Sequence, residues 1–349
     1  MTLNITAERS EQLHLWLSQH ADKYQFDLPS LQVASSDASF RSYYRIYSAS
    51  LDKTLIIMDA PPPHENCAVF SDIAHLLKEQ ELHVPEILEQ DDQAGFLLQS
   101  DLGNTTYYQA VQAELDDSIL QTMYRQALDA LVLMQKTPAE HLPHYDAKRL
   151  REEMNLFEEW YVQKYKEDAL SDNEKKLLYP ALDALAEKNA QEPKVFVHRD
   201  FHSPNLMLIK SEQEALNPGI IDFQDALYGP LSYDVASLVM DARTTWEEPQ
   251  QLDWAIRYWE KARAADLPVP TDFADFHRNY EAMGLQRNLR ILGVFARLAL
   301  RDNKTHYLNH IPRVIAYIRQ VANRYSEYAI VARILDRLEN ITIEARYTF

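Results

Sequence analysis

Apolar residues recur with two different periods along the chain. Short alternating runs at residues 43–47, 54–58 and 95–99 predict β-strands, and a helical stripe at residues 67–81 predicts one helix between the last two. An amphipathic helix is predicted before them, over residues 8–26. The pattern therefore predicts a small sheet accompanied by helices in the first third of the chain.

Helical periodicity dominates the rest of the chain. The predicted helices cover residues 117–136, 146–166, 173–189, 232–242, 250–265, 272–300, 310–326 and 328–340. Short strand-like runs interrupt them at residues 194–197, 206–209 and 219–223. The change of pattern near residues 100–105 predicts an α+β protein with a small β-rich lobe, residues 1–102, and a large, mostly helical lobe, residues 103–349.

The composition narrows the classes of partner. The 349 residues include 35 Lys and Arg against 53 Asp and Glu, which gives a formal net charge of −18. So acidic a surface disfavours binding to nucleic acid or to an anionic membrane, and no run of about 18 apolar residues is present to span a bilayer. Cys67 is the single cysteine, which excludes a disulfide framework. We expect a cytoplasmic protein with no obligate protein partner.

The residues that carry chemistry are concentrated in two segments. Residues 198–205 read His-Arg-Asp-Phe-His-Ser-Pro-Asn, which matches the kinase pattern H-R-D-x-x-x-x-N, and Asp222-Phe223 follows at the end of an apolar run. Asp200 can accept the proton of an acceptor hydroxyl, whereas Asn205 and Asp222 offer the hard oxygen atoms that Mg²⁺ prefers. A hairpin of residues 206–209 with 220–223 would bring Asn205 beside Asp222. The alternative is that these polar residues only cap a turn and end a strand.

Residues 194–237 resemble the superfamily of aminoglycoside phosphotransferases and choline kinases. The resemblance rests on Asp222-Phe223-Gln224-Asp225-Ala226, which leads through Gly229-Pro230 directly to Tyr233-Asp234 at the start of a helix. It implies a protein-kinase-like two-lobe fold, ATP as phosphoryl donor and Mg²⁺ as cofactor. A protein kinase is disfavoured because the chain has neither a long activation segment nor an Ala-Pro-Glu triplet after Asp222.

The same resemblance assigns the nucleotide to the first lobe. The residues it implies as nucleotide contacts are Ser36, Ser39, Phe40, Arg41 and Arg45 in a loop over the phosphates, and Gln99, Ser100 and Leu102 beside adenine. A plain hairpin turn is the alternative for the loop. The position of the phosphate-binding strand lysine of kinases is occupied by Met58. Positive charge must then come from Arg41 or Arg45, or the protein binds nucleotide without turnover.

A narrower resemblance extends over residues 30–320. The segments that carry it are 38–45, 58–63, 83–87, 100–103 and 286–297. They are similar to the anomeric amino-sugar kinases of bacterial cell-wall recycling, which phosphorylate the C1 hydroxyl of N-acetylmuramate and N-acetylglucosamine. The resemblance implies the same reaction here. Another acceptor on the same fold, such as an aminoglycoside, choline or homoserine, remains the alternative.

An acceptor of this kind needs its own contacts. N-acetylmuramate carries a carboxylate that an arginine can hold through two hydrogen bonds, and Arg287 and Arg290 share one predicted helix. The other candidate sugar contacts are Gln224, Asp225, Tyr228 and His202. Structural ion pairs, loop capping and bracing of the catalytic loop are the respective alternatives. The glutamates between residues 152 and 159 are interpreted as a solvated helix face.

Overall fold

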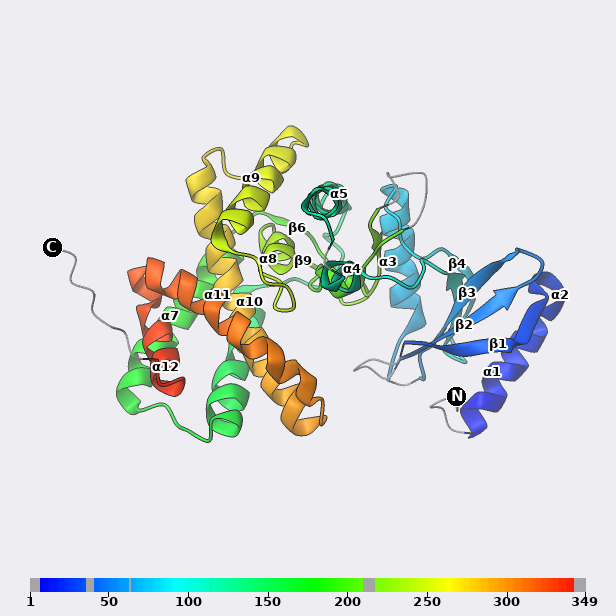
Figure 1. The fold of residues 1–349 in the computed structure, drawn as a ribbon, viewed down its shortest axis with the longest axis horizontal. Helices are drawn as coiled ribbons and strands as arrows, with labels where there is room; N and C mark the ends of the chain where they lie inside the picture. Colours follow the sequence, from blue (N-terminus) through cyan, green and yellow to red (C-terminus); the bar gives the residue numbers. More distant parts are fainter. Residues whose placement is uncertain (1–6, 36–40, 63, 114, 210–216, 342–349) are drawn as a thin grey trace. The chain divides into compact units, whose positions relative to one another are not determined.

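The computed structural model describes residues 7–35, 41–62, 64–113, 115–209 and 217–341 (Figure 1). Contacts within the chain divide it into two units. The first unit comprises residues 1–105 and 207–224, and the second comprises residues 106–206 and 225–349. None of the described helices is both long and apolar enough to cross a membrane.

The first unit is built on a five-stranded antiparallel sheet with the strand order β1-β2-β3-β5-β4. Its elements are α1 (Ala7–Gln19), α2 (Ala21–Tyr24), β1 (Phe26–Ser35), β2 (Ser42–Ser48), β3 (Lys53–Asp59), α3 (Cys67–Glu79), β4 (Ile87–Asp91) and β5 (Phe96–Ser100). The predicted pairing of the later strands is confirmed, although β7 (Leu206–Met207) and β8 (Gly219–Ile220) are shorter than expected.

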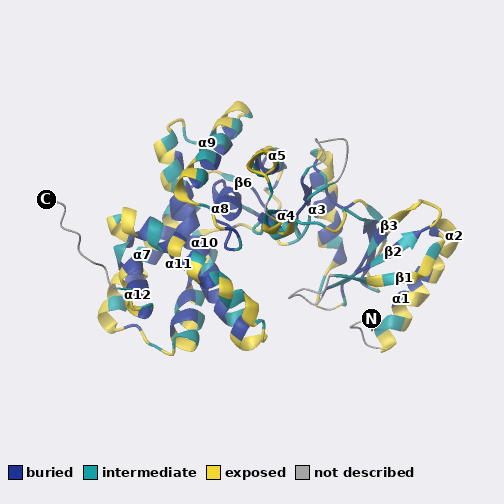
Figure 2. Cartoon of the chain, viewed as in Figure 1, coloured by how far each residue is buried: buried dark blue, intermediate teal, exposed yellow. Residues whose placement is uncertain are grey.

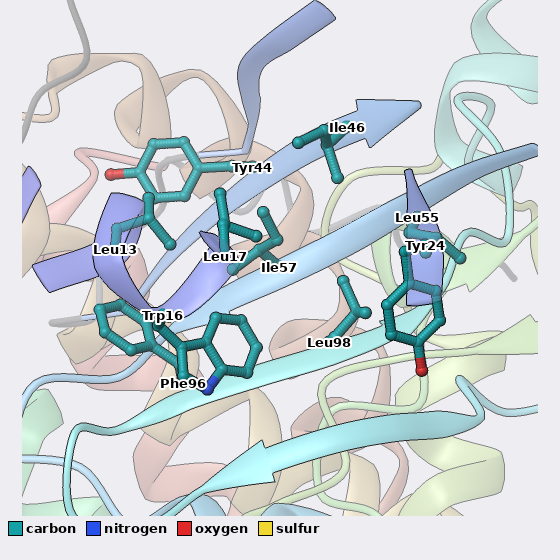
Figure 3. Close-up of a cluster of buried hydrophobic side chains, with 10 residues drawn as sticks. All are labelled: Leu13, Trp16, Leu17, Tyr24, Tyr44, Ile46, Leu55, Ile57, Phe96 and Leu98. Carbon is teal, nitrogen blue, oxygen red and sulfur yellow. The ribbon is translucent and has the colours of Figure 1, made fainter. Parts of the chain in front are cut away.

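Helix α1 covers one face of this sheet (Figure 3). The buried side chains of the interface are Leu13, Trp16, Leu17, Tyr24, Tyr44, Ile46, Leu55, Ile57, Phe96 and Leu98. Because side chains alternate along a strand, the residues between these, such as Tyr43 and Met58, lie on the opposite face. Arg9 reinforces the contact: its guanidinium donates to the Asp59 carboxylate at 2.6 and 2.8 Å and lies 4.0 Å from the centre of the Phe96 ring.

The sequence pattern does not predict two strands of the sheet, β1 and β4, because neither has an alternating apolar pattern. Strand β1 contains Pro29 and has two register shifts against β2, so no alternating pattern marks it. Strand β4 is an edge strand whose residues Leu88 to Asp91 are mostly polar and only partly buried. Hydrophobic alternation reveals a strand only where one face is buried.

The second unit is almost entirely helical. Its longer helices are α5 (Asp117–Met134), α6 (Ala147–Leu156), α7 (Asp172–Ala190), α9 (Glu248–Ala264), α10 (Phe273–Arg301), α11 (Ile311–Arg324) and α12 (Ala329–Leu338). Its shorter elements are α4 (Tyr107–Gln112), the π-helix η1 (Phe157–Tyr165), η2 (Ser203–Asn205), α8 (Tyr233–Val239), η4 (Thr305–His310) and η5 (Ser326–Tyr328), with β6 (Lys194–Val197) paired to β9 (Leu227–Pro230). Figure 2 shows α8 and much of α10 in the colour of buried residues.

Helix α10 is the axis around which the second unit packs. It contacts α6, η1, α8 and α11. At Gly293 the packing leaves no room for a side chain, because an added Cβ would lie 2.2 Å from the carbonyl oxygen of Leu156. The single helix predicted for residues 146–166 changes to π-helical geometry immediately after this contact, at Phe157. Close packing against α10 therefore marks the place where the helix widens.

A buried glutamate joins the end of α7 to the start of α8. Glu192 accepts hydrogen bonds from the backbone N–H of Ser232 at 3.1 Å and from its hydroxyl at 2.7 Å. Burial raises the pKa of Glu192 to about 7, although the two bonds from Ser232 act in the opposite direction. The folded protein therefore retains a proton on Glu192 that the unfolded chain releases near pH 4.5.

This difference predicts a pH-dependent stability. The contribution of Glu192 to the free energy of unfolding is fully present below pH 4.5 and is lost as the pH rises through 7. At 1.4 kcal/mol per pKa unit the loss is on the order of 3 kcal/mol. Glu192→Gln should make the decline of the urea midpoint between pH 5 and pH 8 shallower, and Asp234, whose pKa burial also raises to about 7, should supply the decline that remains. The exposed Glu187→Gln should keep the full decline, and equal slopes for both variants would contradict the prediction.

Candidate active site

The loop between β6 and β7 is held by a buried carboxylate. Asp234, at the start of α8, accepts hydrogen bonds from the backbone N–H groups of His198 at 2.6 Å and Arg199 at 3.0 Å. Arg199 has a φ of 75°, a left-handed conformation that a non-glycine residue adopts only at a cost. Burial raises the pKa of Asp234 to about 7, against the effect of the two N–H groups. The helix thus fixes an otherwise unfavourable loop.

The loop presents Asp200 in a defined orientation. Its backbone carbonyl accepts hydrogen bonds from the His202 N–H and from the side-chain amide of Asn205, both at 3.0 Å. Its side chain is 32% exposed. Asp200 and Asn205 therefore belong to one hydrogen-bonded turn in the second unit, with the Asp200 carboxylate accessible from one side.

Positive charge surrounds this carboxylate. Burial disfavours ionisation of Asp200, but the charges of Arg290, Arg287 and Arg199 outweigh it, so the pKa of Asp200 lies below its usual value. Glu153 links two of these arginines: it accepts from Arg199 at 2.8 Å and lies 3.5 Å from Arg290. At neutral pH Asp200 is a carboxylate inside a cluster of guanidinium groups.

The network corrects two expectations from the sequence. Glu153 is a nearly buried partner of two arginines and not part of a solvated face. Of the two arginines predicted to bind substrate, Arg287 is 1% exposed, whereas the Arg290 side chain is 16% exposed and lies 3.5 Å from Glu153, so substrate binding by Arg290 stays a prediction. Their charge acts on Asp200, and Arg287 has no surface that a substrate can reach.

A second carboxylate holds the other side of the loop. Asp241, just after α8, accepts from the backbone N–H of Ser203 at 3.0 Å and from its hydroxyl, and its other oxygen accepts the backbone N–H of Arg243 at 3.0 Å. His202 lies between the two carboxylates, with its Nε2 atom 3.9 Å from the Asp200 carboxylate. Burial, assisted by the charge of Arg243, lowers the pKa of His202 to about 3, so the imidazole is neutral. No feature of the sequence marked Asp241 or Arg243.

The first unit carries the other candidate metal ligand, Asp222. Its carboxylate accepts a hydrogen bond from the side-chain amide of Gln224 at 2.9 Å and is 43% exposed. Arg41 lies 3.9 Å from Asp222 through Nη2 and 3.6 Å from Glu65 through Nε. Arg41 precedes Tyr43 by two residues, and Tyr43 is the cross-strand partner of the buried Met58. A cation from the start of β2 therefore lies beside Asp222 on the sheet face that displays Met58.

Arg45, the other predicted phosphate contact, has a different environment. Its guanidinium donates to both oxygens of Asp101, at 2.5 and 2.9 Å, and to the carbonyl of Gly103 at 3.0 Å. Thr54 donates to the same carboxylate at 2.6 Å. Arg45 thus anchors the segment that follows β5, and its charge is used within the first unit.

That segment borders a cavity of about 370 Å³. The residues that line it are His83, Asp101, Leu102, Gly103, Asn104, Thr105, Leu208 and Ile209. Of the three residues predicted to contact adenine, Leu102 lines this cavity. Gln99 is buried within β5, and Ser100 exchanges hydrogen bonds with Glu86 through its N–H and its hydroxyl.

The remaining predicted contacts are dispersed. Ser36, Ser39 and Phe40 lie outside the described residues. Asp225 is exposed, and Tyr228 is half-buried on β9 with its ring against His144. Gln224 belongs to the first unit, where it contacts Asp222, whereas Asp225 and Tyr228 belong to the second.

These features define the class of the protein. The model of the phosphotransferase enzyme family matches residues 30–270, and the chain belongs to this family. The structure of an aminoglycoside 2'-phosphotransferase in complex with GDP aligns with 90% of this chain and 99% of its own, at a TM-score of 0.58 and 14% identity. The protein is therefore a phosphotransferase with a protein-kinase-like fold.

Within the family, the chain is similar to enzymes named for one pair of substrates. It is 41% identical over 339 residues to the N-acetylmuramate/N-acetylglucosamine kinase of Pseudomonas putida, which covers 95% of this chain and 97% of the relative. It is 40% identical over 344 residues to the enzyme of the same name from Neisseria meningitidis, covering 98% of this chain and all of the relative. The similarity extends through both units.

The hydrogen bonds of Asp234 generate a test of the loop. Asp234→Asn keeps the shape of the side chain but offers only one acceptor oxygen, so one of the two N–H groups loses its partner. A lost buried hydrogen bond costs about 1–3 kcal/mol, and its effect on the orientation of Asp200 should lower kcat roughly ten- to hundredfold. The surface variant Asp253→Asn is the matched control. A folded Asp234→Asn protein with unchanged kcat would show that the orientation of Asp200 does not depend on the two hydrogen bonds that Asp234 accepts.

Proposed function

We propose that the protein transfers the γ-phosphoryl group of ATP to the anomeric hydroxyl of N-acetylmuramate or N-acetylglucosamine and releases the sugar 1-phosphate and ADP. The observation that carries the proposal is the 40–41% identity, over nearly the whole chain, to kinases named for these two sugars. The anomeric position rests on the sequence resemblance of the segments between residues 38 and 297.

In the proposed reaction Asp200 is the catalytic base. The anomeric oxygen forms the new bond to the γ-phosphorus while the bond between that phosphorus and the ADP oxygen breaks, and the Asp200 carboxylate takes the hydroxyl proton. An anomeric hydroxyl is more acidic than an ordinary alcohol, so a carboxylate is an adequate acceptor for the proton that it loses as the bond to phosphorus forms. The surrounding arginines keep Asp200 ionised over the whole physiological pH range.

Asn205 in the second unit and Asp222 in the first unit remain our candidate Mg²⁺ ligands, on the chemistry of their side chains. The fit is chemical: Asp222 provides a partly exposed anionic oxygen and Asn205 a neutral amide oxygen, the donor types that this ion accepts. When bound, Mg²⁺ neutralises charge on the phosphate oxygens. Within the protein, the turn around Asp200 orients Asn205, and Gln224 orients Asp222.

The first unit supplies the proposed nucleotide contacts. The cavity beside Leu102 is the site assigned to adenine, and Arg41 provides the positive charge that the strand lysine provides in other kinases. The loop residues Ser36, Ser39 and Phe40 remain expected phosphate contacts. The proposal retains the assignment of nucleotide covering to residues 1–102 and of catalysis and acceptor binding to residues 103–349.

The charge around Asp200 supports an amino-sugar acceptor over an aminoglycoside. The charges of Arg290, Arg287 and Arg199 act on the base, and the charge of Arg243 acts on its neighbour His202. An aminoglycoside carries several positive charges and would be repelled by this cluster, whereas a sugar with a carboxylate would be attracted.

The proposal is tested by following ADP release with Mg²⁺-ATP and a panel of acceptors. We expect turnover with N-acetylmuramate and N-acetylglucosamine and none with their 1-O-methyl glycosides, which have no anomeric hydroxyl. Asp200→Asn should lower kcat by about 10²–10⁴ because it removes the proton acceptor. Phosphorylation of a 1-O-methyl glycoside, of choline or of an aminoglycoside in place of the free sugars would overturn the proposal.

The role of Arg41 is tested separately. Arg41→Met removes the charge beside Asp222, and the loss of a charge-assisted contact of about 1.5–3 kcal/mol should raise the KM for ATP roughly ten- to hundredfold. The KM for the sugar should change little, because the sugar is assigned to the second unit. Lys78→Met on α3 removes an exposed charge as a control. An unchanged KM for ATP would mean that another cation meets the phosphates.

A further inference from the structure

Arg243 combines a backbone tied to the Asp200 loop through Asp241 with a guanidinium that forms no ion pair within 4.0 Å in the described part of the chain. We propose that Arg243 binds the carboxylate of N-acetylmuramate and thereby sets the preference between the two amino sugars. The inference deepens the proposed function and rests on it. The binding subsite is formed by Arg243 on one side and by the rings of Phe295 and Tyr307 beneath it.

The backbone of Arg243 is tied to the catalytic loop. One oxygen of Asp241 accepts two hydrogen bonds from Ser203, and the other accepts the N–H of Arg243. Ser203 is three residues from Asp200 in the same loop. A single buried carboxylate therefore ties the backbone of Arg243 to the loop that carries the proposed base.

The side chain of Arg243 is stiffened by aromatic rings. Its guanidinium carbon lies 5.7 Å from the centre of the Phe295 ring and 5.8 Å from that of Tyr307, and the two rings contact each other at 5.1 Å. A cation over aromatic faces is attracted to them and retains its N–H donors at the edge of the guanidinium plane. The residue is half-buried, so an anion can reach it from solvent and meets reduced dielectric screening there.

The other cations near Asp200 are already engaged or enclosed. Arg199 and Arg290 share Glu153, and Arg287 is 1% exposed. Within the described ranges no carboxylate lies within 4.0 Å of the Arg243 guanidinium, so it differs from Arg199, Arg290 and Arg45 in having no ion pair. In a chain with a net charge of −18, a half-buried arginine whose guanidinium donors form no direct ion pair can accept an anionic ligand, although the charge of Asp241 offsets part of its own.

The two sugars differ in the group that Arg243 would bind. N-acetylmuramate carries a lactyl ether with a carboxylate, and N-acetylglucosamine has a hydroxyl at the same carbon. A guanidinium holds a carboxylate through two parallel N–H···O bonds, a geometry that lysine does not reproduce. Arg243 is therefore expected to contribute to binding of the first sugar far more than to binding of the second.

The experiment measures kcat/KM for both sugars in the wild type, Arg243→Met and Arg243→Lys. The value of kcat/KM for N-acetylmuramate divided by that for N-acetylglucosamine should fall about ten- to hundredfold in Arg243→Met, the effect of losing a charge-assisted contact. In Arg243→Lys this ratio should fall by an intermediate factor. Arg257→Met on α9, whose guanidinium pairs with Asp253, is the matched control and should leave the ratio unchanged.

A neutral substrate analogue makes the test independent of the folding of the variants. The methyl ester of N-acetylmuramate should be as poor a substrate for the wild type as the acid is for Arg243→Met, and Arg243→Met should not distinguish ester from acid. Equal losses for both sugars, or an ester as good as the acid in the wild type, would overturn the inference. Failure of the wild type to phosphorylate either sugar would instead overturn the proposed function.

Discussion

The hydrogen bonds that Asp234 accepts from His198 and Arg199 are the constraint on which the site depends. They hold a non-glycine residue in a left-handed conformation and so set the direction in which the chain enters Asp200. The turn that follows is held by its own hydrogen bonds, because the backbone carbonyl of Asp200 accepts both the His202 N–H and the side-chain amide of Asn205. A carboxylate at the start of one buried helix therefore positions both the proposed base and a proposed metal ligand.

The loop that Asp234 holds also determines the electrostatic surroundings of Asp200. The protein has a large excess of acidic residues, but the immediate surroundings of Asp200 are rich in arginine. These arginines lower the pKa of Asp200, so it is ionised without needing a substrate or metal to make it so. The same guanidinium groups create a positive region that favours anions against the negative charge of the whole molecule. Glu153 compensates part of this charge and holds Arg199 and Arg290 in place, which offsets part of the free-energy cost of burying the two guanidinium groups.

How much of this the sequence could predict depends on how local each feature is. The helices with a continuous apolar stripe and the pairing of β7 with β8 follow from short-range patterns, and the structure confirms them, whereas the catalytic role of the loop around Asp200 stays a prediction. Strands β1 and β4 were missed because neither has a cleanly buried face. Glu153 and Arg290 come from two different helices, so helical spacing places Arg287 and Arg290 on a shared face but does not show whether that face is internal. Arg243 lies in a short segment without periodicity, and only the fold brings it near Ser203 through Asp241.

The absence of a lysine at Met58 has a structural explanation in the register of the sheet. Tyr43 lies opposite Met58, and these two side chains occupy the face where a strand lysine would project. The neighbouring position, Asp59, is used on the helix α1 side, where it holds Arg9 and helps to fasten that helix to the sheet. A cation reaches Asp222 from the residues just before β2: Arg41 lies there, two residues before Tyr43 and within 4 Å of both Asp222 and Glu65. The two arginines therefore have different roles. Arg45 is bound to Asp101 and anchors the segment beside the cavity, whereas Arg41 supplies the positive charge beside Asp222, the proposed metal ligand.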